Sequence, residues 1–305
     1  MKLEKLWVLL LAVLLLGVVT GCSTADDDDS TGNDDDDDSA PGDDDSGDDD
    51  DSAPGDDDSA PGDDDTGDDD DTGDDDDSTP EPCDQVYTGA FTITNSDDVA
   101  TLTPYCEITQ SLIVDAPGLT DVLLPNLTTV GGYLQVTSNE HLVSFSLPAL
   151  EEVGYATWFS ENPSLTTLSV PSLSVLGHLT VAENTSLTSF DFSGLTVVGG
   201  GGMSVTDNPA LTSCAFPSLE NVGNIGGSLN VMNNQVLSSL SLPALSFAGG
   251  GFAVRDNPEL AQCLVDAIQA QVEAAQGSSL GSSSHDNNDA CICEEVDGVL
   301  EASCD

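Results

Sequence analysis

Six asparagines recur at a nearly constant interval through the middle of this chain of 305 residues. They are separated by 22 to 26 residues, and a leucine stands three residues after each of them. They are Asn139, Asn162, Asn184, Asn208, Asn234 and Asn257. A fixed period of this length is typical of a solenoid, in which each repeat forms one coil and buries its apolar face against neighbouring coils.

Two apolar residues precede most of these asparagines, five and three positions earlier. The pairs are Leu134/Val136, Leu179/Val181, Met203/Val205, Leu229/Val231 and Phe252/Val254, whereas the coil of Asn162 has Thr157/Phe159. A period of two predicts short strands with these side chains inward and the residues between them outward. Stacked in phase, the strands would form a parallel sheet. We expect the aligned asparagines to form a structural ladder that satisfies backbone groups at the bend, in preference to binding a ligand.

The chain begins with an apparent targeting segment, residues 1–21. Two lysines precede an almost unbroken apolar run from Leu6 to Val19, which is short for a membrane-spanning helix and typical of a signal peptide. The ending Val19-Thr20-Gly21-Cys22 resembles the bacterial lipobox, which implies cleavage before Cys22 and acyl chains, such as palmitate, on that residue. An ordinary secretory signal beside a free cysteine is the alternative. In enteric bacteria, an aspartate directly after the lipidated cysteine tends to hold a lipoprotein at the inner membrane. Ser23 stands at that position and therefore favours the outer membrane.

Residues 22–82 form a low-complexity segment with thirty aspartates between Asp26 and Asp77. It has no aromatic or large apolar residue, so it is predicted to be a disordered, extended tether. Its carboxylates would attract loosely bound Ca²⁺, although no sequence of a fixed calcium loop is present.

The formal net charge of the chain is −54, and Arg255 is its only lysine or arginine beyond the first five residues. Binding to nucleic acid or to anionic headgroups needs basic side chains that neutralise phosphates, so both are excluded. Cationic partners or divalent ions are favoured instead.

The two ends of the repeat region carry features typical of caps. At the start, Cys83 and Cys106 flank an alternating strand around Phe91, and a bridge between them would seal the first coil. At the end, an amphipathic helix is predicted with Leu264, Ile268, Val272 and Ala275 on one face and a stop at Gly277. A polar loop, residues 278–289, follows.

Residues 83–293 resemble the receptor L domain, the leucine-rich-repeat-like β-helix of the insulin and EGF receptors, with relatives among bacterial surface lipoproteins. The resemblance rests on Cys83 to Cys106, then Ser111-Leu112-Ile113-Val114, then coils of Leu-x-Val-x-x-Asn and Pro-x-Leu-x-x-Val-Gly. It implies a mostly β, right-handed parallel solenoid of about six to seven coils over residues 83–305, with a C-terminal capping helix. In the animal receptors the domain binds peptide hormones, but no hormone-contact motif is matched here.

Seven cysteines remain after Cys22. Cys214 occupies a core position of its coil and is predicted to be a buried free thiol, because Cys263 in the same position lies two coils away, roughly 9.6 Å. The expected pairs are Cys83–Cys106, Cys263–Cys291 and Cys293–Cys304, and the last two are open to permutation. A zinc site is disfavoured since Cys291-Ile292-Cys293 lacks the usual CxxC spacing.

The outward face of the predicted strands is the candidate ligand surface. Trp158 stands out there, because the other coils carry small or polar residues at its position. An outward tryptophan is a typical anchor for a glycan or a peptide; local packing in a shifted coil is the competing interpretation. The candidate residues are Tyr133, Gln135, Trp158, His178 and Thr180.

A carboxylate precedes several of the asparagines, at Glu161, Glu183, Asp207 and Asp256. Stacked carboxylates repel unless cations lie between them, but a solvated edge is the favoured explanation. The three histidines have no obvious nucleophile partner, so an enzyme is not expected. We therefore expect a bacterial outer-membrane lipoprotein, exposed at the cell surface, that binds a protein or glycan or acts in adhesion. The alternative is a structural envelope protein with non-specific divalent-cation binding.

Overall fold

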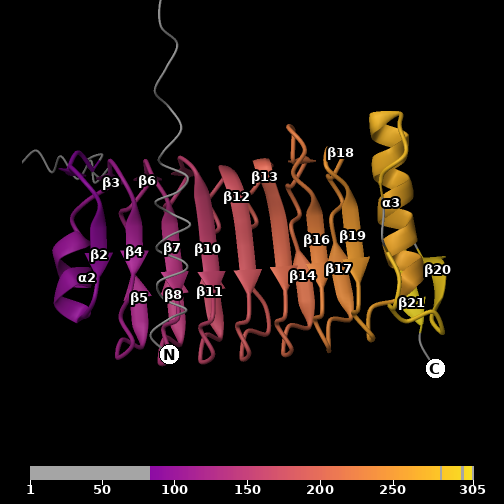
Figure 1. Cartoon of the computed structure of the whole chain (residues 1–305), viewed down its shortest axis with the longest axis horizontal. Helices are drawn as coiled ribbons and strands as arrows, with labels where there is room; N and C mark the ends of the chain where they lie inside the picture. Colours follow the sequence, from indigo (N-terminus) through magenta and orange to yellow (C-terminus); the bar gives the residue numbers. More distant parts are fainter. Residues whose placement is uncertain (1–82, 282–283, 297–298, 304–305) are drawn as a thin grey trace, which may run out of the picture. The chain divides into compact units, whose positions relative to one another are not determined.

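The computed structural model describes residues 83–281, 284–296 and 299–303. These residues form a parallel β-solenoid of about seven coils with a helix near its C-terminal end, which confirms the predicted fold class (Figure 1). The predicted signal peptide, the lipidated Cys22 and the acidic tether lie outside the described residues. Within the described part, no helix is both long and apolar enough to cross a membrane.

The coils stack three rows of parallel strands, of which the sequence pattern predicted only the second. The second row contains the strands that lead to the asparagines. It runs through β2 (Phe91–Ile93), β4 (Leu112–Val114), β7 (Leu134–Thr137), β10 (Ala156–Ser160), the C-terminal parts of β12 (Val175–Ala182) and β13 (Val197–Thr206), β16 (Leu229–Met232) and β19 (Phe252–Arg255).

The first row precedes the second in each coil and consists of very short strands. It runs through β1 (Val86–Tyr87), β3 (Glu107–Ile108), β6 (Thr129–Val130), β9 (Glu152–Val153), the N-terminal parts of β12 and β13, β15 (Asn221–Val222) and β18 (Phe247–Ala248). The third row follows the asparagines, as β5 (Asp121–Leu123), β8 (Ser144–Ser146) and β11 (Thr167–Ser169), and then as β14 (Ser213–Ala215) and β17 (Ser239–Ser241).

The core is one column of side chains that runs the length of the stack. The residues five and three positions before each asparagine are buried, and so are the leucines three positions after it. Thr157 takes an inward position as predicted and is fully buried, but its hydroxyl has no hydrogen-bond partner among the described residues. Each apolar layer therefore depends on its neighbours for burial, as in other repeat proteins.

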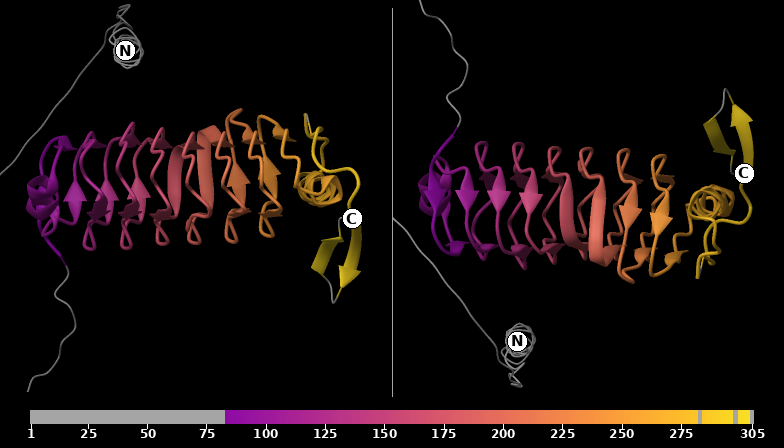
Figure 2. Two further views of the ribbon diagram at one scale, coloured as in Figure 1. Left: turned by 90° about the horizontal axis from the view of Figure 1, so that it is seen from below. Right: turned by 90° about the horizontal axis from the view of Figure 1, so that it is seen from above.

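Helices cover both ends of this column, α2 at one and α3 at the other (Figure 2). Helix α2 (Ser96–Leu102) was not predicted; the Asn95 side chain caps its N-terminus and Leu102 is buried in the core. Helix α3 (Gln262–Gln276) ends at Gly277, which has a φ of 70°, as predicted. Its buried residues are Val265, Ile268 and Val272, so the face predicted to include Leu264 and Ala275 is rotated by about one residue.

The disulfides connect these caps to the chain. Cys83 pairs with Cys106, as predicted, with 5.8 Å between their Cα atoms. Cys263 pairs with Cys293, 6.0 Å away between Cα atoms, so the first-named pairs Cys263–Cys291 and Cys293–Cys304 are wrong. For Cys263 the structure has the permuted partner that the sequence analysis left open. Residues 291 and 293 alternate with exposed Ile292 at the start of β20 (Ile292–Val296), so both cysteines face the same side and the spacing alone did not distinguish them.

Of the remaining cysteines, the structure describes Cys291 and Cys214. Cys291 is also disulfide-bonded, while Cys304 lies outside the described residues. Strand β20 forms an antiparallel hairpin with β21 (Val299–Ser303). Cys214 is a buried free thiol, as predicted, and burial raises its pKa to about 12.

Candidate functional site: an aromatic cluster and a carboxylate ridge

The aligned asparagines form a continuous hydrogen-bonded ladder, as predicted, and this ladder fixes the second row. The Oδ1 atom of Asn162 accepts from the backbone nitrogen and the Nδ2 of Asn139, both at 3.1 Å. Asn162 in turn donates its Nδ2 to the Val136 carbonyl at 2.9 Å. The same pattern repeats along the stack, and all six side chains are almost fully buried.

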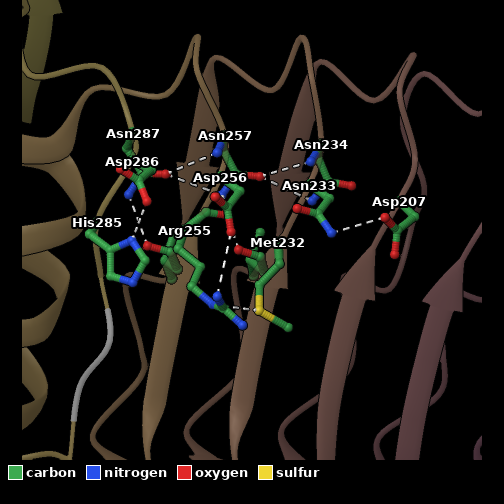
Figure 3. Close-up of polar contacts among 12 residues, drawn as sticks. Asp207, Met232, Asn233, Asn234, Arg255, Asp256, Asn257, His285, Asp286 and Asn287 are labelled. Atoms are coloured by element: carbon green, nitrogen blue, oxygen red, sulfur yellow. Dashed lines mark hydrogen bonds and ion pairs between the residues drawn. The ribbon is translucent and has the colours of Figure 1, made fainter.

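The ladder has a further rung that the sequence interpretation missed. The Oδ1 of Asn287 accepts from the backbone nitrogen and Nδ2 of Asn257, both at 3.3 Å, and its Nδ2 donates to the Val254 carbonyl (Figure 3). Residues 278–289 were predicted to be only a polar loop. A signal was present, because Asp286-Asn287 repeats the acidic residue–asparagine pair of Glu161-Asn162 and Asp256-Asn257. Helix α3 lies between Asn257 and Asn287 and lengthens their separation to 30 residues, which hides the repeat.

The residue before each rung has a left-handed backbone. Its φ lies between 57° and 59° at Ser138, Glu161, Glu183, Asp207, Asn233, Asp256 and Asp286. Apart from glycine, asparagine and aspartate adopt this conformation at the lowest cost, so the turn into the ladder constrains these positions. Their side chains follow one another from coil to coil, as Figure 3 shows for Asp207, Asn233 and Asp256.

We call Glu161, Glu183 and Asp207 the carboxylate ridge. Ser138 Oγ donates to Glu161 at 2.9 Å, and Asn233 Nδ2 donates to Asp207 at 3.0 Å. The structure therefore places all three predicted residues in consecutive coils. However, no group of three or more His, Cys, Asp or Glu side chains within the described residues is arranged to hold a metal ion. Loose Ca²⁺ binding at this ridge stays a prediction.

Four aromatic side chains gather on the outer side of the second row, and we call them the aromatic cluster. The centroid of the Tyr133 ring lies 5.4 Å from that of Tyr155 and 5.4 Å from that of Trp158, and Trp158 lies 6.3 Å from His178. Tyr155 is 60% exposed and Tyr133 44%, while Trp158 and His178 are half-buried. The structure thus brings together three of the predicted residues and adds Tyr155.

The coil that carries Trp158 is in regular register. Trp158 lies on β10, which has β7 on one side and β12 on the other. Trp158 pairs with Gln135 on β7 and with Thr180 on β12. All five predicted residues therefore lie on one surface, and the shifted coil invoked by the packing interpretation is not found. Trp158 points outward between two polar neighbours.

The tyrosines reach this surface through a repeated glycine–aromatic pair. Gly132-Tyr133, Gly154-Tyr155 and Gly177-His178 occur in three consecutive coils. A Cβ at Gly154 would overlap the Gly131 carbonyl oxygen, because adjacent backbones approach closely at this bend. This pair is the signal that could have identified Tyr155 from the sequence.

His178 is held in a defined orientation. Its Nδ1 lies 2.7 Å from the Gly201 carbonyl oxygen, which can only accept, so Nδ1 carries a hydrogen. Its Nε2 lies 2.8 Å from the Thr180 hydroxyl, so both ring nitrogens have a hydrogen-bond partner. Gln135 Nε2 donates to Thr137 Oγ1 at 3.1 Å. The polar groups around Trp158 are therefore positioned before any ligand arrives.

The other histidines lie elsewhere. His141 is exposed in a turn, and His285 Nδ1 lies 2.6 Å from Asp286 Oδ2 near the last rung. The neighbouring Ser284 hydroxyl is buried without a hydrogen-bond partner among the described residues, so it does not form a triad with His285 and Asp286.

No family model matches the chain, and comparison with curated proteins and with solved structures found no significant match.

Proposed function

We propose that this protein is a lipid-anchored bacterial surface protein whose receptor L-like solenoid binds a ligand through the aromatic cluster, without catalysis. The observation that carries the proposal is the gathering of Tyr133, Tyr155, Trp158 and His178 on one outward surface. Large aromatic side chains with an exposed face and a polar group supply much of the binding energy at recognition surfaces. Their exposure has no evident role in folding.

Rigidity supports the same proposal. Trp158 and His178 lie on β10 and β12, and the two tyrosines directly precede β7 and β10; these three strands are joined in register and held by the asparagine ladder. A ligand would therefore find the rings already placed, and little conformational entropy would be lost on binding. A rigid sheet face with an aromatic anchor suits recognition or adhesion better than catalysis, which also needs groups that transfer protons or attack a substrate.

The envelope location rests on three features of the chain. The segment before Cys22 resembles a lipoprotein signal, and two disulfides in the described residues suit an oxidising compartment. The acidic segment after Cys22 would raise the solenoid above an outer membrane, by up to roughly 200 Å if fully extended. A long reach suits a domain that meets partners beyond the cell surface.

Trp158 provides the test, because Trp7, the second tryptophan, lies in the predicted signal peptide. The emission spectrum of the full chain carrying Trp7→Phe is recorded in detergent while cell-envelope fragments are added. We expect emission typical of a partly solvated ring and a shift that saturates, and we expect Tyr155→Ala to weaken the response. A Trp158 signal that ignores every fragment, together with unchanged fragment binding in Trp158→Ala, would instead favour the structural envelope protein.

A further inference from the structure

The aromatic cluster and the carboxylate ridge lie on overlapping coils, with the rings on or just before strands of the second row and the carboxylates directly after such strands. Trp158 precedes Glu161 by three residues, and both lie on the coil of β10. Tyr133 to His178 spans two coil steps, as does Glu161 to Asp207, so each set extends over roughly 10 Å along the stack. The two sets overlap in the coils of β10 and β12. A ligand that contacts the rings would therefore also meet carboxylates.

The ridge has no cation of its own. Arg255, the only arginine or lysine among the described residues, lies two coils beyond Asp207, where it is 3.6 Å from Asp256 and donates to the Met232 sulfur (Figure 3). The donors on Glu161 and Asp207 are a neutral hydroxyl and a neutral amide. The structure gives the Glu183 carboxylate no side-chain partner among the described residues. Three negative charges on adjacent coils therefore repel one another without compensation.

We propose that the aromatic cluster and the carboxylate ridge form one docking surface for an extended basic segment of a partner protein. This inference rests on the proposed function and names its ligand class. Guanidinium or ammonium groups would lie over the Trp158 and Tyr155 rings and pair with the ridge. Arginine suits both, because its planar group stacks on aromatic rings and bonds carboxylates through two nitrogens.

Charge complementarity favours this occupant over others. The formal net charge of −54 repels anionic ligands, and a neutral ligand would leave the repulsion along the ridge in place. A basic segment relieves that repulsion and uses the rings.

The test uses a hexa-arginine peptide as the probe and the full chain with Trp7→Phe, in which Trp158 is the only reporter. The acidic segment also attracts this peptide, but it is the same in all variants, and only binding near Trp158 changes the signal. We expect saturable quenching at low salt. The affinity should weaken as sodium chloride rises from 50 to 500 mM, because the Debye length then falls from roughly 13 Å to roughly 4 Å.

Two charge-matched variants distinguish the ridge from general acidity. The first carries Glu161→Gln, Glu183→Gln and Asp207→Asn. The control carries Asp84→Asn, Glu259→Gln and Glu294→Gln, which removes three exposed carboxylates away from the ridge. We expect the first to weaken binding on the order of tenfold, as the loss of three exposed ion pairs implies, and the control to change it less than twofold. Circular dichroism verifies that both are folded.

Equal effects of the two triple variants, or an absence of quenching by hexa-arginine, would overturn the basic-segment inference. The proposed function has a separate readout, the response of Trp158 to envelope fragments. If an uncharged oligosaccharide shifts Trp158 while hexa-arginine does not, ligand binding by the aromatic cluster stands and the ligand class is wrong. If nothing shifts Trp158, both proposals fail.

Discussion

The side-chain amide of Asn257 donates to the Oδ1 of Asn287 at 3.3 Å, although 30 residues separate them. Through this bond the ladder of the regular coils continues beyond α3 and ends in the C-terminal cap. The repeat and its cap therefore share one hydrogen-bond network. We expect the loss of a terminal rung to affect stability differently from the loss of an internal rung.

Asn184→Ala is expected to lower the free energy of unfolding by about 2–4 kcal/mol, because it removes the buried acceptor of the Asn162 backbone N–H and a buried donor to the Phe159 carbonyl. Urea denaturation followed by circular dichroism measures the loss. Asn230→Ala, at an outward position of β16, is the control and should change stability by no more than about 0.5 kcal/mol. A small effect at Asn184 would mean that water replaces the rung.

Asn287→Ala should loosen the cap and leave the middle coils intact. Stability in a solenoid is a sum of local units and their interfaces, so the loss of a terminal rung affects mainly the adjoining coil. Hydrogen exchange should quicken at the Asn257 and Gln262 amides and stay unchanged in β10. Uniform acceleration along the chain would contradict this expectation.

Gly154→Ala should destabilise the domain by about 1–3 kcal/mol and alter Trp158 emission, because the added Cβ overlaps the Gly131 carbonyl oxygen beside the aromatic cluster. The matched control is Gly118→Ala. A Cβ at Gly118 meets nothing within 4 Å, so this variant should keep the stability and emission of the parent. Thermal unfolding and fluorescence of the two variants give the comparison.

Thr157→Val should stabilise the domain by about 1 kcal/mol. The change keeps the side-chain shape and removes a hydroxyl that is fully buried without a partner in the described residues. Thr206→Val, outward on β13, should be close to neutral. Destabilisation by Thr157→Val would show that the hydroxyl finds a partner in solution. Both variants are compared by urea denaturation.

Acid should loosen the contact between the end of α3 and the loop that follows it. The Leu280 backbone amide, and then the Gln269 side chain, donate to Glu273 and hold its pKa below the ordinary value of 4.5. A lowered folded-state pKa contributes stability that is present above pH 4.5 and is lost as the pH falls through the folded value. Exchange of the Leu280 amide should therefore quicken in acid relative to its intrinsic rate. Glu273→Gln should remove this pH dependence, and Glu259→Gln should keep it.

The sequence period predicted the second row, the ladder and the buried positions, because each coil repeats the same inward pattern. It did not predict the first and third rows, whose strands of two or three residues have no alternation to detect. Helix α2 was missed since its seven residues are held by the Asn95 cap and by Leu102, contacts that depend on the tertiary fold.

The candidate site was predictable only in part for a similar reason. Tyr133 lies six residues before its asparagine and Tyr155 seven, so an alignment on asparagine placed the two rings in different columns. The contact between the two tyrosines depends on how the bend before β10 accommodates the one extra residue of that coil. Likewise, Cys291 and Cys293 share one side of a strand, and only the position of α3 decides which of them meets Cys263.

The asparagine ladder also bears on how such a chain can change over time. Every internal rung offers the same acceptor to the coil before it and the same donors to the coil after it, so any two coils present compatible ends. A duplicated or deleted segment running from one asparagine to the next would restore the network without alteration of either cap. The domain can therefore gain or lose length one whole coil at a time, in steps of roughly 4.8 Å.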